Sequence, residues 1–389
     1  MRGRSSRRLI GRLRMAARAL RYGICRRPRK PGSPGTILVL HHLLLGDTLM
    51  LAALFKALRS RWQAARIVTT CAPAILPLFA GRPWQVDAVA FDPRQPDTLD
   101  GLFALCRGGV DLALLPGENR YALLAHACGA QWIRGLAGDH PAWKNALCDE
   151  LLPWPQQSCA LPEIFATLAD AGVPARYQRG EWSVQAVSVT PSCIPDLRSA
   201  VLHVGAGNPL RCWPADAWRA VADGLADRGL QPVWSCGPGE QGLVHAVDPE
   251  GCYETRLAGR LDLVGLWQLL TRASILVCLD SGVAHMAKLA GCPTACIFGQ
   301  GSANLFGAGD FFREMPFVSL IEDDVPCRDQ RQLFGRKLPW VRRCARRPGE
   351  CLDPVCIKAI TPSAVLEACS QLLGAMPEAS EGDHSYKRG

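Results

Sequence analysis

The hydrophobic positions of this chain fall into short apolar runs that alternate with stretches of helical spacing. The run at 274–279 (SILVCL) is short enough to be a fully buried strand. It stops at Asp280-Ser281-Gly282, and residues 283–290 then resume with helical spacing. Gly291-Cys292-Pro293 ends that helix, and the apolar run at 294–298 reads as the next strand. The pattern therefore predicts a strand, a tight turn, a helix and a second strand.

The same alternation extends over the body of the chain. Further strands are predicted near 36–40, 67–70, 88–91, 111–115, 132–135, 200–204 and 231–235, and helices near 47–60, 73–79, 98–106, 121–128, 161–172, 214–228, 263–273 and 362–373. Strands that alternate with helices predict parallel, doubly wound sheets of the Rossmann-like α/β class. No Gly-x-Gly-x-x-Gly follows the first strand, so the dinucleotide-binding fingerprint is absent there.

The chain has 389 residues, enough for two domains of about 150–200 residues each. We expect an arm and linker at 1–35, a first domain at 36–190, a second domain at 191–375 with a cysteine-rich insert at 322–358, and a disordered tail at 376–389. No apolar run reaches the length of about 18 residues that a spanning helix needs, which indicates a soluble or peripheral protein. The 18 cysteines come without a secretory segment and are expected to be reduced in the cytoplasm.

The positive charge is concentrated at the N-terminus. Residues 1–30 contain twelve Arg and Lys and no acidic residue, which leaves −3 of the net +9 for the rest of the chain. Leu9, Leu13, Ala16, Ala17, Leu20 and Ile24 recur there at helical spacing between the arginines. Such a basic amphipathic helix suits an anionic membrane surface. A mitochondrial transit segment, an RNA-binding arm and a solvated tail are the alternatives.

Two strand-to-helix turns carry the candidate chemistry. The Asp280-Ser281-Gly282 turn offers free backbone N–H groups and a positive dipole end at the carboxyl edge of a sheet, which is an anion site. His285 follows within one helical turn, where it either faces this site or fills the core. Gly46-Asp47 places a second carboxylate after the first strand. Each aspartate could also be a plain helix cap.

Several stretches, taken in order, are similar to the family 9 glycosyltransferases, the bacterial ADP-heptose:lipopolysaccharide heptosyltransferases. The resemblance covers about residues 36–375. The matching segments are Leu45-Gly46-Asp47, His203-Val204-Gly205-Ala206 with Arg211-Cys212-Trp213-Pro214, Leu257-Ala258-Gly259, and the most specific, Asp280-Ser281-Gly282-Val283-Ala284-His285 followed by Phe298-Gly299. The family implies a GT-B fold of two facing Rossmann-like domains, with the C-terminal helix crossing back to the first domain.

The resemblance also implies roles for individual residues. Asp47 is the implied general base, and as an aspartate at a helix N-terminus it is expected to be ionised. Arg211, usually Lys in the family, is the implied clamp on the leaving phosphate, although it could be an ordinary surface arginine. The remaining donor-binding residues are Gly205, Ala206, Glu240 (to the ribose), Asp280, Ser281, Gly282 and His285, which is expected to brace the turn. The second domain has no Asp-x-Asp motif for a metal, so protein donors are expected to stabilise the departing diphosphate.

Four cysteines lie in the Arg-rich insert at 322–358. Cys327, Cys344, Cys351 and Cys356 could ligate a structural zinc or iron ion. The insert has no Cys-x-x-Cys pair, and reduced free thiols are the other interpretation.

The sequence thus predicts an inverting glycosyltransferase that needs no cofactor for catalysis. It would transfer a heptose from an ADP-sugar donor to a lipid-linked oligosaccharide acceptor of the lipopolysaccharide core. Residues 1–30 would hold it peripherally at the cytoplasmic face of the inner membrane, and no nucleic-acid partner is expected. The alternatives are a glycosyltransferase with another sugar nucleotide or a protein acceptor, and a non-catalytic α/β protein whose arm binds membrane or RNA.

Overall fold

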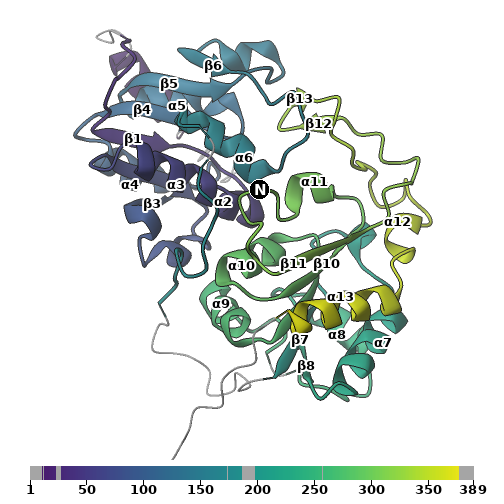
Figure 1. Ribbon diagram of the computed structural model, residues 1–389. Coiled ribbons are helices and arrows are strands. Elements are labelled where there is room, and N and C mark those ends of the chain that lie inside the picture. The colour runs from purple at the N-terminus through teal and green to yellow at the C-terminus, as the bar shows by residue number, and fades with distance from the viewer. Residues whose placement is uncertain are drawn as a thin grey trace, which may run out of the picture.

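The computed structural model describes residues 11, 13–22, 28–172, 174–185, 198–255 and 257–375. The predicted domain boundary near 190, the tail at 376–389 and Leu9 and Ile24 of the arm lie outside these residues. The chain forms two lobes, each built on one parallel sheet (Figure 1). Among the described helices, none combines the length and the hydropathy that crossing a membrane requires.

The first lobe contains a six-stranded sheet in the order β3-β2-β1-β4-β5-β6. Its pairs are all parallel, as the α/β prediction required. The strands are β1 Thr36–Val39, β2 Arg66–Cys71, β3 Val86–Ala90, β4 Val110–Leu115, β5 Ala130–Leu136 and β6 Glu150–Leu152. The connecting helices are α2 Leu45–Met50, α3 Ala52–Arg61, α4 Thr98–Leu105, α5 Ala122–Ala127 and α6 Leu161–Ala166.

Two predicted helices of this lobe differ in detail. The helix expected at 47–60 begins at Leu45 and is divided at Leu51 into α2 and α3. The one expected at 73–79 is only a short 3-10 turn, η1 Leu76–Phe79, because its prolines remove backbone donors. The other 3-10 turns of the lobe are η2 Pro83–Gln85, η3 Asn119–Tyr121, η4 Ala142–Asn145 and η5 Thr167–Ala169.

The second lobe contains a five-stranded parallel sheet in the order β11-β10-β9-β7-β8. Its strands are β7 Ser199–His203, β8 Gln231–Ser235, β9 Ile275–Leu279, β10 Thr294–Phe298 and β11 Phe317–Ile321. Its helices are α7 Ala215–Ala226, α8 Gln241–Val247, α9 Leu263–Arg272, α10 Gly282–Ala290, α11 Ala303–Phe306 and α13 Pro362–Gly374, with a 3-10 turn η6 at Pro209–Arg211. Every residue of β7, β9 and β10 is buried, which explains why these strands read as continuous apolar runs.

The insert, not the C-terminal helix, crosses back to the first lobe. Helix α13 packs on α7 and on β9, β10 and β11, so the crossing expected of it is not observed. The insert instead carries the hairpin β12 Gln332–Leu333 and β13 Arg336–Lys337, and then α12 Val355–Lys358. The buried Arg336 guanidinium donates to the carbonyl oxygens of Gly117 (2.8 Å), Leu136 (2.8 Å) and Ala137 (2.9 Å) of the first lobe.

The two lobes share one continuous buried apolar cluster, which fixes their mutual position. The segment that precedes the second lobe contributes Tyr177 and Trp182. The Tyr177 hydroxyl donates to the carbonyl of Leu289 in the second lobe (2.7 Å), and the Trp182 indole donates to that of Leu78 in the first (2.9 Å). At the centre of the junction α2 packs against α10 (Figure 1).

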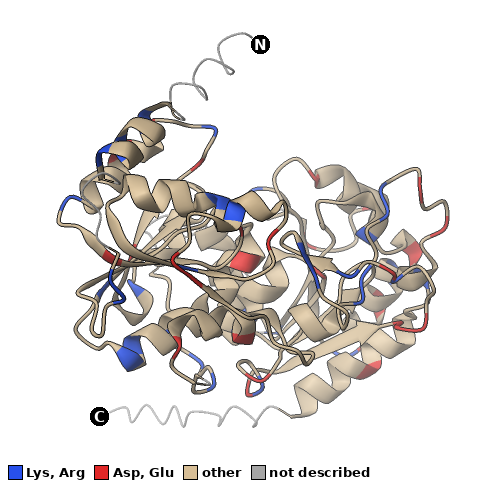
Figure 2. Cartoon of the chain, turned by 90° about the horizontal axis from the view of Figure 1, so that it is seen from above, with Lys and Arg blue, Asp and Glu red and all other residues tan. Residues whose placement is uncertain are grey.

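The N-terminal helical residues 13–22 lie on the outer side of the first lobe, away from the second (Figure 2). Ala19 is buried and Met15 packs against the apolar cluster of the first lobe, while the Arg18 guanidinium stacks over the Phe103 ring, 4.2 Å from its centroid. The predicted apolar stripe is on the other face: Leu13 and Leu20 are 61% and 67% exposed. The arm is therefore anchored by one face and leaves its leucines in contact with solvent.

Candidate functional site

The site lies where the N-termini of α2 and α10 meet between the lobes. Gly46 is the second residue of α2, and a Cβ added to it would lie 3.3 Å from Cα of Gly282 and 2.6 Å from Cδ2 of His285. A Cβ at Gly282 would lie 2.9 Å from Leu45. The two turns recognised in the sequence are thus pressed together across the interface, and glycine is what permits this approach.

Asp47 is the acidic residue of this junction. Its pKa is raised to about 7, first by burial and then by the nearby Asp280 carboxylate, while Arg343 and Arg211 act in the opposite direction. The expectation of a fully ionised Asp47 is therefore corrected: because of desolvation and the Asp280 charge, the carboxyl is only partly ionised at neutral pH. A carboxylate with a pKa near neutrality is well matched to accepting a proton.

Asp280 directly follows β9 on the second lobe, and its charge acts on Asp47. It is buried, burial raises its pKa, and its Oδ2 atom has no hydrogen-bond partner. Arg211, at the end of η6, donates to the Asp280 carbonyl at 2.9 Å and keeps its guanidinium 3.8 Å from Oδ2. The Arg211 Nε atom is also buried and unpartnered. A buried acceptor and a buried donor without hydrogen-bond partners therefore lie close together. Such a pair is expected where a polar ligand binds.

His285 sits one turn into α10, below the junction. Burial holds its pKa well below the usual value, so the ring is neutral, and its Nδ1 atom has no partner. The ring packs against Gly46 and, edge-on, against Phe306. His285 is therefore placed to support the α2 turn of the first lobe, whereas the sequence analysis had expected it to brace the Asp280-Ser281-Gly282 turn of its own lobe. Ser281 is the N-cap of α10, and its Oγ accepts from the Val283 N–H at 3.4 Å.

The glycine turn after β7 encloses Glu240. The carboxylate of Glu240 accepts the backbone N–H groups of Gly237 (2.9 Å) and Gly207 (3.4 Å). A Cβ at Gly205 would collide with this carboxylate, so the turn needs glycine there. Ala206 follows in the same turn and is half-buried. Glu240 thus lies at the carboxyl edge of the second sheet, on the lobe that carries Arg211 and Asp280.

The structure adds Arg343, which the sequence analysis did not single out. Its charge acts on Asp47, Asp280 and Arg211, and burial lowers its own pKa. The neighbouring Cys344 N–H donates to the Gln300 carbonyl (2.9 Å), and the Gln300 side-chain oxygen accepts from Asn208 (2.9 Å). These bonds fix the insert to the carboxyl edge of the second sheet. The only sequence signal was the Arg-rich composition of the insert, which does not distinguish one arginine from another.

The four cysteines of the insert come near one another without forming a liganding group. Burial raises the pKa of the Cys356 thiol, and the thiols of Cys327, Cys344 and Cys351 add to that rise. The Cys344 sulfur accepts from the Gln300 amide at 3.8 Å. Throughout the described ranges, no group of three or more His, Cys, Asp or Glu is arranged to hold a metal ion. A metal at these cysteines remains a prediction.

A small cavity of about 200 Å³ opens beside Asp47 on the first lobe. His41, His42, Glu118, Arg120 and Tyr121 are among its lining residues, and Phe334 of the insert closes one side. His41 is buried, which lowers its pKa to about 3, and it is therefore neutral. The cavity gives Asp47 access to a ligand that approaches from the first lobe.

Comparison with known proteins matches residues 104–336 to Glycosyltransferase family 9 (heptosyltransferase). Lipopolysaccharide heptosyltransferase 3 of Escherichia coli is 29% identical over 155 residues, which cover 33% of this chain and 45% of the relative. The matched part thus spans under half the length of that relative. The structure of E. coli ADP-heptose lps heptosyltransferase II has a TM-score of 0.63 at 20% identity, covering 87% of this chain and 98% of that one. For E. coli heptosyltransferase WaaC with ADP the TM-score is 0.57 at 14% identity, with coverage of 70% and 90%. At these identities the structures show that the fold is shared, namely GT-B.

Proposed function

Because this chain belongs to glycosyltransferase family 9, the heptosyltransferase family, we propose that it transfers a heptose from ADP-heptose to a lipid-linked acceptor of the lipopolysaccharide core, with inversion and without a catalytic metal. The observation that carries the proposal is the convergence of Asp47 from the first lobe with Arg211 and Asp280 from the second. A binding module has no need for a proton acceptor facing an anion site.

Asp47 is the proposed general base. The acceptor hydroxyl attacks the anomeric carbon of the donor as the bond to the diphosphate breaks, and Asp47 takes the hydroxyl proton. A pKa of about 7 keeps much of Asp47 ionised at neutral pH and lets it hold the proton once the bond has formed. Arg211 and Arg343 favour the ionised form, while Asp280 opposes it.

The departing ADP carries the negative charge that the site must stabilise. Arg211, with the Ser281 and Gly282 N–H groups at the α10 N-terminus, is the proposed set of donors to the terminal phosphate. The unpartnered Nε atom of Arg211 leaves one donor available for this purpose. Arg343 adds a further positive charge near these donors, because it interacts electrostatically with Arg211 as well as with Asp47 and Asp280.

The second lobe is the proposed nucleotide site. Gly205 and Ala206 let the ADP approach the end of β7, and Glu240 lies beside them to accept from the ribose hydroxyls. The unpartnered Oδ2 atom of Asp280 can accept from the donor sugar or orient the Ser281 turn. Membership of the heptosyltransferase family favours ADP as the nucleotide. The proposed ADP site is on the second lobe, and the proposed acceptor side of the junction is on the first.

Residues 1–30 are the proposed attachment to the anionic cytoplasmic face of the inner membrane. Helical residues 13–22 expose Leu13 and Leu20, with Arg21 exposed beside Leu20, while Arg14 and Arg18 are held against the first lobe by Asp100 and Phe103. An exposed apolar stripe next to basic residues suits an interfacial helix. In vesicle sedimentation with anionic lipids, Leu20→Glu should weaken binding and leave ADP affinity unchanged. Equal sedimentation of both proteins at physiological salt would place the attachment elsewhere.

Calorimetric titration of ADP with and without a chelator, followed by a transfer assay with ADP-heptose, tests the function. We expect ADP to bind equally in both titrations and heptose to reach a lipid-linked core acceptor with inverted anomeric configuration. A strict magnesium requirement, or a clear preference for UDP, contradicts the donor assignment. Nucleotide binding without any transfer would favour a non-catalytic role.

A further inference from the structure

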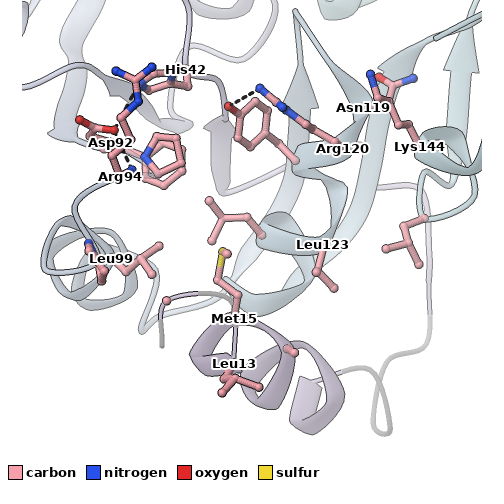
Figure 3. Close-up of a pocket in the computed structure, with 18 of the residues that line it drawn as sticks. Leu13, Met15, His42, Asp92, Arg94, Leu99, Asn119, Arg120, Leu123 and Lys144 are labelled. Atoms are coloured by element: carbon pink, nitrogen blue, oxygen red, sulfur yellow. Dashed lines mark hydrogen bonds and ion pairs between the residues drawn. The ribbon is translucent and has the colours of Figure 1, made fainter. Parts of the chain in front are cut away.

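A cavity of about 920 Å³ lies between the N-terminal helix and the first lobe (Figure 3). Every lining residue belongs to the first 147 residues, so the cavity is separate from the nucleotide side of the junction. Its walls come from Gly11, Leu13, Met15 and Ala16 at the N-terminal helix, the loop after β3, the η3–α5 turn, and η4 with the residues after it. The volume is in the range of pockets that enclose small organic ligands.

The cavity adjoins the small cavity beside Asp47. His42, Arg120 and Tyr121 line both of them. These three side chains stand between the two cavities, so a ligand that reaches from the proposed base to the inner face of the N-terminal helix has to pass them. This adjacency ties the large cavity to the acceptor side of the proposed reaction.

The lining is amphiphilic. Figure 3 shows His42, Arg94, Arg120 and Lys144 gathered along one side and Leu13, Met15 and Leu123 along the other. The Trp143 and Leu123 side chains, which also line the cavity, are 66% and 38% exposed. Apolar surface left uncovered inside a concave pocket gains free energy when an apolar ligand covers it.

The polar side carries charges of both signs. Arg120 is paired with Glu118 (2.9 Å) and donates to the Tyr121 hydroxyl (3.3 Å), and Lys144 lies 3.2 Å from Asp139. The Asp92 carboxylate also lines this side and accepts the backbone N–H of Arg94 (2.8 Å). An occupant with a hydroxyl-rich head near Asp47, which can donate to carboxylates and accept from guanidinium groups, and an apolar tail under the helix satisfies both sides.

We propose that this cavity holds the acyl chain of a lipid-linked glycan acceptor, with Leu13, Met15 and Ala16 as its outer wall and the sugar part directed toward Asp47. The inference rests on the proposed function, because it specifies the acceptor of that reaction. It also gives the N-terminal helix a second role: Met15 and the first part of the apolar stripe, Leu13 and Ala16, line the cavity, while Leu20 of the same stripe does not.

The test uses the full-length protein and a series of alkyl glucosides from hexyl to dodecyl, each below its micellar concentration. Binding is followed by calorimetry in the absence of any nucleotide, so the result is independent of donor identity and turnover. If the chain enters the cavity, affinity should rise with each methylene, up to about fourfold per group, as expected for burial of a CH₂. A flat dependence on chain length contradicts the proposal and favours a polypeptide or a fully polar acceptor.

Two leucines of the same helix supply the matched variants. Leu13 lines the cavity and Leu20 does not, and they are 61% and 67% exposed. Leu13→Gln should reduce the chain-length dependence, while Leu20→Gln should leave it unchanged. Equal losses in both variants would mean that the glycosides coat the outer helix surface.

A second pair of variants repeats the comparison away from the helix. Leu123 lines the cavity and Leu151 does not, and they are 38% and 39% exposed. Leu123→Gln should reduce the chain-length dependence, and Leu151→Gln is its control. Chain binding without heptose transfer would overturn the proposed function but not the cavity.

Discussion

Gly46 of the first lobe is in direct contact with the ring of His285 of the second, so tightly that a Cβ at Gly46 would lie 2.6 Å from Cδ2 of that ring. The ring is buried, and it packs against Phe306 on a further side. A side chain at position 46 must therefore displace the α2 turn or the α10 helix. Because Asp47 follows directly, either displacement moves the proposed base relative to the anion site.

Gly46→Ala should lower turnover much more than it lowers ADP affinity. The proposed nucleotide residues lie on the second lobe and should keep their own contacts, while misplacement of a catalytic group by about 1 Å can cost 10²-fold in rate. The control is Gly242→Ala in α8, where an added Cβ meets nothing within 4 Å. Steady-state kinetics and ADP calorimetry on both variants check the prediction, and normal turnover in Gly46→Ala would show that the junction tolerates the shift.

Asp47→Asn should abolish general-base catalysis and keep the fold. Loss of such a base costs about 10²–10⁴ in rate, and ADP affinity should barely change. In the unmodified enzyme, kcat/KM should fall as the pH drops below about 7, where Asp47 becomes protonated. Near-normal turnover in Asp47→Asn would mean that Asp47 is only a helix residue.

The same substitution should change stability with pH in a defined direction. Since the folded pKa of Asp47 is raised above 3.8 to about 7, the proton bound by the folded state stabilises it most fully below pH 4, and this contribution is lost as the pH rises through 7. Asp47→Asn carries no such charge. Its Tm should therefore exceed that of the unmodified protein at pH 8, and the difference should shrink toward pH 4. A Tm difference independent of pH would contradict the raised pKa.

Arg343→Ala should shift the pH profile as well as the rate. Its charge lowers the pKa of Asp47, so its removal should move the acidic limb of kcat/KM to higher pH. Loss of one charged contact, worth about 1.5–3 kcal/mol, corresponds to a 10- to 150-fold drop in kcat/KM. Arg342→Ala is the matched control, because that side chain is exposed. A lower rate with an unchanged pH profile would mean that Arg343 only supports the insert.

Arg211→Ala should impair both nucleotide binding and turnover. Its guanidinium is held beside Asp280 at 3.8 Å, and the charge it supplies matters most as the phosphate departs. The rate should fall by about 2.7–4 kcal/mol of transition-state stabilisation, as for other preorganised donors. ADP calorimetry distinguishes this variant from Asp47→Asn, which loses rate alone. Unchanged ADP affinity would remove Arg211 from the phosphate site.

Cys327, Cys344, Cys351 and Cys356 of the insert should together ligate one structural zinc or iron ion. Elemental analysis of the purified protein is then expected to give about one equivalent, lost in a Cys351→Ser/Cys356→Ser variant. The exposed Cys252, replaced by Ser, is the control. Metal-free protein of unchanged Tm would assign the four residues as free thiols.

The local pattern of the sequence determined the fold class and the position of the two functional turns. Strands buried on both faces must be continuously apolar, as in β9 and β10, and turns after parallel strands must fall at the carboxyl edge of their sheet. Asp47 and Asp280 could therefore be assigned to such edges before the structure was known. The hydrophobic spacing also identified the exposed leucine stripe of the N-terminal helix.

The tertiary structure alone decided how these elements act on one another. The pKa of Asp47 depends on desolvation and on Asp280 and Arg343, which the chain brings in from the other lobe and from the insert. The segment that crosses back to the first lobe is the insert and not α13. Arg336 of the insert donates to three backbone carbonyl groups of that lobe. Burial and Coulomb interactions depend on distance in space, whereas a sequence pattern reports only on near neighbours in the chain. The sequence could therefore single out Asp47 as a candidate base, but not its raised pKa or the influence of Arg343 on it.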